Sequence, residues 1–182
     1  RGSRQRGEVV GSPMERGMDR RDVVALFFEY WKAQDVDMAL SLAAEDVVYN
    51  LYLSNSAVPH GGETRGRERC REVLYAVLAD FDYLHYAPTI VGEDGDVVRA
   101  QVEFRYHHRR TGGLLAGTKR MVFAVEDGLI TRVDEHHDAG LVEAFMRLTQ
   151  QREAANEVQA PPELPKGRAR TCATPQDKEG QS

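Results

Sequence analysis

The sequence predicts an α+β fold in which helices gather on one face of a mainly antiparallel sheet. Three observations support this prediction. Apolar side chains recur at helical spacing in residues 20–43 and 67–81, which lie on either side of one strand-like segment and a loop. From residue 83 to residue 137 the spacing changes to an alternation of apolar and polar side chains, which is typical of strands. Helical spacing then returns for one closing segment.

Four helices are predicted from apolar stripes and from residues that cap helix ends. In the first helix, Val23, Phe27 and Trp31 share one face. Asp35 and Asp138 each precede a helical segment, and an aspartate at that position can accept a hydrogen bond from a free backbone N–H group. The predicted helices span residues 20–34, 36–43, 67–81 and 139–154.

Five strands are predicted, one before the third helix and four after it. The first, DVVYNLYL, is rich in β-branched and aromatic residues. The last two are joined by EDGL, whose Asp-Gly pair is a strong signal for a tight hairpin turn. Residues 54–66 are rich in Gly and Ser and are predicted as a loop. The predicted strands span residues 46–53, 83–91, 97–109, 117–125 and 129–137.

The composition argues against several classes of protein. The 182-residue chain has 24 Lys and Arg residues against 29 Asp and Glu, so it lacks the positive charge typical of nucleic-acid binders. No apolar run is long enough to span a membrane, and the N-terminus lacks the apolar segment of a secretion signal. Two cysteines, Cys70 and Cys172, do not suggest a disulfide framework. We therefore expect a cytoplasmic protein with neither a nucleic-acid nor a membrane partner.

A single domain is predicted for residues 19–151. The six Phe, seven Tyr and single Trp all lie between Phe27 and Phe145, and buried aromatic side chains supply much of the stability of a core. Residues 1–18 and 157–182 lack apolar periodicity. We expect two disordered tails there, the first of which could instead be a remnant of cloning.

Three segments resemble the SnoaL-like polyketide-cyclase branch of the nuclear-transport-factor-2-like superfamily. They are FFEYWKAQDVDMALSLAAEDVVY, GRERCREVL and FAVEDGLITRVDEHHDAGLVEAF, and the likeness covers residues 19–148. The resemblance implies a cone-shaped fold, the cystatin-like α+β roll, in which helices pack on the concave face of a curved sheet and enclose an apolar pocket. Members include isomerases, cyclases, dehydratases, epoxide hydrolases and non-enzymatic binders, so the fold alone does not name a reaction.

Two branches of this superfamily place catalytic groups at positions that can be compared with this chain. The ketosteroid isomerases use a base carboxylate and an acidic hydrogen-bond donor. Those positions fall close to Leu51 and Met121 here, so steroid isomerisation is not expected. The limonene epoxide hydrolases use a tyrosine, an asparagine, an arginine and two aspartates, and partial matches leave epoxide hydrolysis open. The nearest equivalents are Tyr49, Asn50, Gln101, Glu103 and Glu135.

Glu103 and Glu135 are candidate acid and base groups. Two carboxylates in an apolar pocket would have their pKa values pushed apart by burial and mutual repulsion, which leaves one as acid and the other as base. Strict alternation along VVRAQVEFRYHH instead turns Glu103 towards solvent, unless a β-bulge or a dimer partner changes that face. We favour the solvent-facing position but keep Glu103 as a candidate ligand contact.

His136 and His137 are the other candidate catalytic groups. Neighbours on a strand point to opposite faces, so one of the two enters the pocket, where Asp134 or Glu135 would assist it in proton transfer. The alternative is a strand-end histidine bonded to a backbone carbonyl or to Asp138. The adjacent histidines cannot together hold one metal ion, and neither a metal nor another cofactor is predicted.

We therefore predict a cofactor-free enzyme that performs acid–base chemistry, such as isomerisation, cyclisation, dehydration or hydrolysis, on an apolar oxygenated small molecule. The alternative is a non-catalytic ligand-binding or dimerisation module of the same fold. A homodimer packed through the sheet is expected in either case. His60, in a Gly-rich loop, is either a lid residue or a solvated one. The predicted catalytic residues are Glu135, His136 and His137, and the predicted ligand contacts are Trp31, Tyr49, Glu103, Tyr106, Met121 and Phe123.

Overall fold

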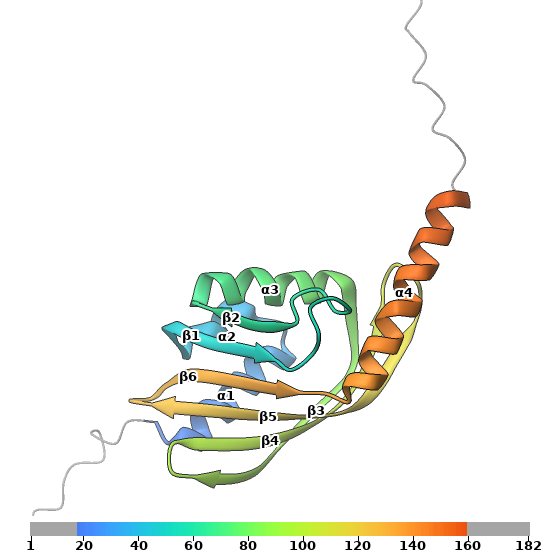
Figure 1. Cartoon of the computed structure of the whole chain (residues 1–182). Coiled ribbons are helices and arrows are strands. Elements are labelled where there is room, and N and C mark those ends of the chain that lie inside the picture. The colour runs from blue at the N-terminus through green and yellow to red at the C-terminus, as the bar shows by residue number, and fades with distance from the viewer. Residues whose placement is uncertain (1–17, 160–182) are drawn as a thin grey trace, which may run out of the picture.

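The computed structural model describes residues 18–159, which form a curved sheet and four helices (Figure 1). The predicted tails lie outside the described residues, apart from residue 18 and residues 157–159. Along the chain the elements are α1 Arg20–Lys32, α2 Val36–Ser41, β1 Ala43–Leu51, β2 Gly62–Arg65, α3 Arg67–Asp80, β3 Phe81–Asp94, β4 Val97–His108, β5 Leu114–Glu126, β6 Leu129–His136 and α4 Ala139–Gln159.

The sheet has six strands in the order β2-β1-β6-β5-β4-β3. Among these strands β1 and β6 pair in parallel, and all other neighbours are antiparallel, which confirms the predicted α+β fold. The prediction that residues 54–66 form only a loop is wrong at its end, where β2 pairs with the edge of β1. The four residues of β2, GETR, include no large apolar side chain. The strand therefore depends on backbone pairing, which leaves no hydrophobic pattern in the sequence.

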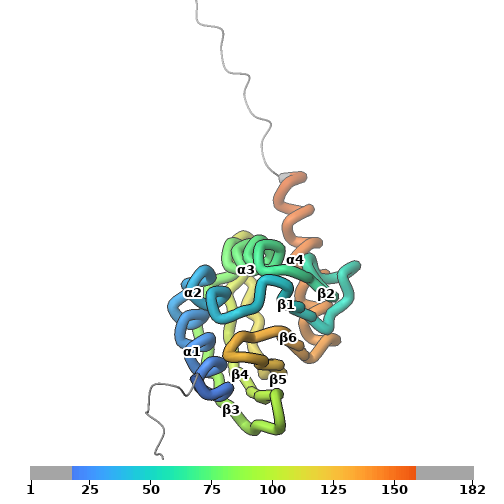
Figure 2. The backbone as a smooth tube through the Cα atoms, turned by 90° about the vertical axis from the view of Figure 1, so that its left-hand side faces the viewer, coloured from blue at the N-terminus to red at the C-terminus, as the bar shows by residue number. Residues whose placement is uncertain are grey.

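The helices cover the concave face of the sheet. Helix α1 contacts β3, β4, β5 and β6, and α2 contacts β1. Helix α3 lies along β1 and β2 and leads directly into β3 at the opposite edge of the sheet, so it spans the open side of the curve. A second view shows α1, α2 and α3 following one another around the side of the sheet (Figure 2).

Aspartate caps begin two of the helices, as predicted. The side chain of Asp35 accepts a hydrogen bond from the backbone N–H of Met38 at 3.0 Å, and that of Asp138 accepts one from Leu141 at 3.1 Å. Helix α4 continues to Gln159, five residues beyond the end that its apolar spacing predicts, and projects past the sheet (Figure 1). Across residues 18–159, none of the helices has the length and apolar character needed to cross a membrane.

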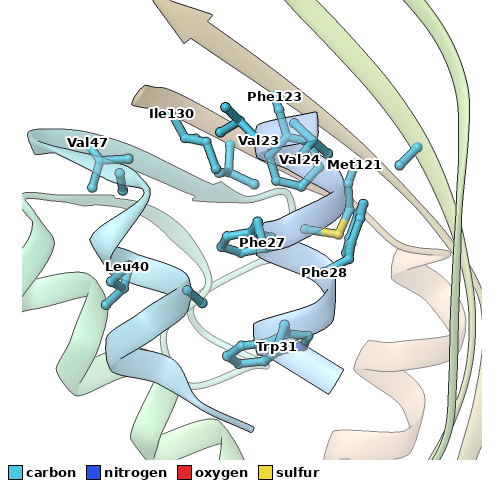
Figure 3. Close-up of a cluster of buried hydrophobic side chains, with 14 of the residues drawn as sticks. Val23, Val24, Phe27, Phe28, Trp31, Leu40, Val47, Met121, Phe123 and Ile130 are labelled. Atoms are coloured by element: carbon cyan, nitrogen blue, oxygen red, sulfur yellow. The ribbon is translucent and has the colours of Figure 1, made fainter. Parts of the chain in front are cut away.

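An aromatic cluster fixes α1 against the inner face of β5. The ring centroid of Phe123 lies 5.4 Å from that of Phe27 and 5.3 Å from that of Phe28, and both contacts are edge-to-face. Phe123 is fully buried, and Val23 and Met121 belong to the same cluster (Figure 3). The apolar stripe predicted for the first helix is therefore the surface that packs on the sheet.

Candidate active site

A second apolar cluster forms beyond α1 on the concave face. Its buried members are Leu53, Val58, Phe104, Tyr106, Leu115, Val142 and Met146. A cavity of about 120 Å³ is lined both by members of this cluster and by Phe27 and Trp31 of the α1 cluster. A cavity of about 150 Å³ holds one benzene molecule in another protein, and this one is slightly smaller.

Three of the polar side chains that line this cavity form one buried cluster. Lys119 comes from β5, Glu135 from β6, and His137 from the residue after β6. Alternation places Lys119 on the same face of its strand as Met121, and it places Glu135 and His137 on the same face as each other. The side chains of Lys119, Glu135 and His137 are 4%, 7% and 7% exposed, so water screens their charges little.

Glu135 is the centre of this cluster. Its Oε1 accepts a hydrogen bond from Nζ of Lys119 at 2.8 Å and another from Nε2 of His137 at 2.6 Å. Its Oε2 accepts one from the hydroxyl of Tyr49. An ionised carboxylate can only accept hydrogen bonds, so we assign the imidazole proton of His137 to Nε2.

Electrostatics keep Glu135 and Lys119 ionised as a pair. Burial by itself would raise the pKa of Glu135, but the Lys119 charge and the hydrogen bond from His137 outweigh it and hold that pKa well below its ordinary value. Burial likewise opposes the charge on Lys119, yet Glu135 raises the ammonium pKa above its ordinary value. Glu135 is consequently a weak base and not a proton donor near neutral pH.

Four tyrosines also line the cavity, and burial raises the pKa of each well above its ordinary value. They are Tyr49, Tyr83, Tyr86 and Tyr106. Nζ of Lys119 lies 5.3 Å from the ring centre of Tyr86 and 5.9 Å from that of Tyr106, within the range of cation–π attraction. The buried hydroxyl of Tyr106 lies beside that of Tyr83, and the ring centroids of these two residues are 4.3 Å apart.

The two adjacent histidines lie on opposite sides of the sheet. His137 lines the cavity with its ring edge-to-face with Phe104 at 5.3 Å, and its buried Nδ1 has no hydrogen-bond partner in the described part of the chain. The ring of His136 instead stacks on Tyr52 with centroids 4.1 Å apart and does not line this cavity. The candidacy of His136 as a catalytic group is therefore withdrawn, because strand alternation turns it away from the cavity.

Three further predicted positions also need correction. The carboxylate of Asp134 faces outward and binds Arg132 at 2.8 to 3.0 Å, so it does not assist His137. Glu103 is exposed on β4 and does not line the cavity, because strict alternation holds there. Phe123 packs on α1 instead of lining the cavity.

Four of the predicted ligand-contact residues do line the cavity, together with one residue that the sequence left as either a lid residue or a solvated one. Trp31, Tyr49, Tyr106 and Met121 line it, as does His60, whose backbone φ is +66°. His60 lies in the loop between β1 and β2, and its positive φ is uncommon for a residue other than glycine.

Lys119, Tyr83 and Tyr86 line the cavity but were missed by the sequence analysis. A signal for Lys119 was present, because it occupies the same alternating set as Met121 and Phe123 along GTKRMVFAV. A lysine among apolar residues on the inward face of a strand requires a buried partner. Tyr83 and Tyr86 are separated by a register shift between β3 and β4, so simple alternation could not place both on one face.

Solved structures share this fold at low sequence identity. A proposed SnoaL-like polyketide cyclase from Mesorhizobium loti is 17% identical with a TM-score of 0.57, covering 66% of this chain and 100% of that one. An NTF2-like protein of unknown function from Burkholderia pseudomallei is 18% identical with a TM-score of 0.62, covering 70% and 96% respectively. A cystatin-like-fold protein from Xanthomonas campestris is 19% identical with a TM-score of 0.61, covering 71% and 98%.

These structures show the fold, which is the cystatin-like arrangement expected from the resemblance. No curated protein matches the chain. The family model described as the SnoaL-like domain matches residues 24–133, which is more than half of the 182 residues. The chain therefore belongs to the SnoaL-like domain family.

Proposed function

We propose that this protein is a cofactor-free enzyme that performs acid–base chemistry on an uncharged, apolar, oxygen-bearing small molecule bound in the cavity. The proposal depends on the two ring nitrogens of His137. Nε2 is bonded to a buried carboxylate, and Nδ1 is buried without a partner among the described residues. The lone pair of a neutral imidazole can accept a proton from a bound ligand.

In this proposal Nδ1 of His137 removes a proton from a carbon or oxygen atom of the ligand and returns it to another atom. Isomerisation, cyclisation and dehydration all require such a transfer. Glu135 orients the imidazole and does not itself exchange protons, which changes the acid–base pair expected from the sequence. The buried hydroxyl of Tyr106, which lines the cavity, would donate a hydrogen bond to a ligand oxygen on which negative charge develops.

The two histidines provide a matched pair of variants for a test. H137Q removes the proposed base, whereas H136Q makes the same change one residue away on the opposite side of the sheet. We expect turnover of a panel of cyclic ketones and epoxides to fall by about 10²-fold or more in H137Q and to stay within about twofold in H136Q. Equal activity of H137Q and wild type on a substrate that the wild type converts would contradict the proposal.

A non-catalytic ligand-binding module is the second candidate. The ion pair favours this candidate, because Lys119 and Glu135 are bonded to each other. In a binding module, the role of this pair would be structural: it would keep one end of the cavity polar. Thermal shift against a library of hydrophobic metabolites, followed by product analysis, separates the candidates. Stabilisation by a ligand without any product favours the binder.

We also propose that the protein forms a homodimer through its sheet. The edge strand β3 supports this, because it exposes Leu84 and Val91 at 51% and 62% of their surface. Light scattering after size-exclusion chromatography should give twice the 20.4 kDa chain mass for the wild type and a smaller mass for the variant L84K/V91K. A wild-type mass of one chain at micromolar concentration would contradict this part of the proposal.

A further inference from the structure

One oxygen of the cavity cluster serves two donors at once. Oε1 of Glu135 lies 2.8 Å from Nζ of Lys119 and 2.6 Å from Nε2 of His137. The two donors therefore compete for the negative charge of one carboxylate. Because all three side chains are at least nine-tenths buried, a change in the charge of one member changes the electrostatic energy of the other two.

The charges in this cluster balance only when His137 is neutral. The ammonium of Lys119 and the carboxylate of Glu135 cancel, so a proton added to His137 would give the buried cluster a net positive charge, which is unfavourable in an apolar environment. Without the ammonium, the carboxylate would be left uncompensated. His137 is then the one remaining basic side chain bonded to it among the described residues, and a proton on its imidazole would restore the balance.

We propose that Lys119 is a positioning residue that sets the charge state of His137: by neutralising Glu135, it keeps the imidazole uncharged, with its proton on Nε2 and its lone pair on Nδ1. Replacing Lys119 by an uncharged residue turns His137 from a proton acceptor into a proton donor. The inference concerns the site of the proposed function, but the charge state that it describes can be measured without a substrate.

The other groups around the cavity do not supply this balance. Tyr49 bonds to the second oxygen of Glu135 as an uncharged phenol, and burial likewise keeps the remaining cavity tyrosines uncharged. Asp80 at the end of α3 has a cation of its own, Arg110, at 3.8 Å. His60 lies in the loop after β1 and is exposed. The lining side chains from α1 and α4 are Phe27, Trp31, Val142 and Met146, and all are uncharged.

The test is an NMR titration of the histidine ring nitrogens in ¹⁵N-labelled full-length protein, with the His137 signals assigned from H137Q. In the wild type we expect a neutral Nε2–H ring at pH 7. In K119M we expect both nitrogens to be protonated at pH 7 and the titration midpoint to rise by about one pH unit or more. K119R keeps the positive charge and should behave as the wild type. K32M makes the same substitution on the exposed surface of α1 and should change nothing.

Two outcomes of the wild-type and K119M titrations would overturn the inference. One is a wild-type His137 that is doubly protonated at pH 7, and the other is an unchanged midpoint in K119M. If K119M does not fold, E135Q gives an independent reading, since the ammonium then stays without its counter-charge. His137 should remain neutral in E135Q and lose its preference for the Nε2 proton, and a charged imidazole there at pH 7 would refute the charge balance. Failure to find a substrate would count against the enzyme and would leave these spectra unaffected.

Discussion

Replacing Glu135 by glutamine tests the ion pair that organises the cavity. The substitution keeps the shape of the side chain but removes the charge that compensates the ammonium of Lys119, and these two side chains are 7% and 4% exposed. Breaking a buried pair by removing one partner costs about 3–5 kcal/mol, because an uncompensated charge stays in the interior. We expect E135Q to lower the free energy of unfolding by that amount.

The assay is urea unfolding at pH 7, followed by circular dichroism and by the fluorescence of Trp31, the single tryptophan, which lines the same cavity. E103Q is the matched control, because Glu103 is exposed on the outer face, and it should stay within about 0.5 kcal/mol of wild type. The double variant E135Q/K119M removes both charges and should lose less stability than the sum of the two single variants, by roughly 0.5–3 kcal/mol. An E135Q protein within about 1 kcal/mol of wild type, or strictly additive losses, would refute the reasoning.

The same ion pair predicts how stability depends on pH. The pKa of Glu135 is held well below its ordinary value in the folded protein, so in acid the unfolded chain binds a proton that the folded chain does not. The stability contributed by this carboxylate is therefore fully present above about pH 4.3, the ordinary value for glutamate, and is lost as the pH falls below it towards the folded pKa. In urea titrations between pH 3 and pH 6, wild type should lose more stability on acidification than E135Q. Parallel curves would show that Glu135 is not specially stabilised.

Three further substitutions test the fold around the cavity. F123A should cost about 3–5 kcal/mol in urea unfolding, because this ring is core and not ligand contact, and a loss below about 1 kcal/mol would contradict that placement. G61A places a Cβ only 2.7 Å from the backbone oxygen of Leu53, so we expect the free energy of unfolding in urea to fall by about 1–3 kcal/mol. An unchanged urea midpoint would show that the loop shifts to make room for the methyl group without cost. D35A removes the cap of α2 and should lower the free energy of unfolding by about 1 kcal/mol, whereas no change would mean that water replaces the cap.

The order of elements could be predicted because most helices and strands depend on residues that are close together in the sequence. Helical spacing of Val23, Phe27 and Trp31 forces one apolar face, and the capping position of Asp35 fixes where the next helix begins. Alternation likewise shows which residues of a strand share a face. Strand β2 escaped prediction because it forms by backbone pairing alone, and that pairing depends on β1 being in place.

Only the tertiary structure shows which side chains at the end of β6 point into the cavity. Ile130 and Val133 are both buried, but they differ by an odd number of positions, so simple alternation gives opposite answers for His136 and His137. The register shift between β6 and β5 at Ala124 and Val125 resolves the conflict, because an extra residue reverses the sides of the strand. It places His137 with Val133 on the inward side.

The sequence by itself determined which faces are apolar and that one of two neighbouring histidines must point inward. Only the tertiary structure decided which histidine it is and which partners it meets. The parallel pairing of β1 with β6 brings Tyr49 to Glu135, and the register of β5 brings Lys119 to the same carboxylate. Lys119 and Tyr49 are 16 and 86 positions away from Glu135 in the sequence. Residues near Glu135 in the sequence cannot identify these partners, because strand pairing brings them together.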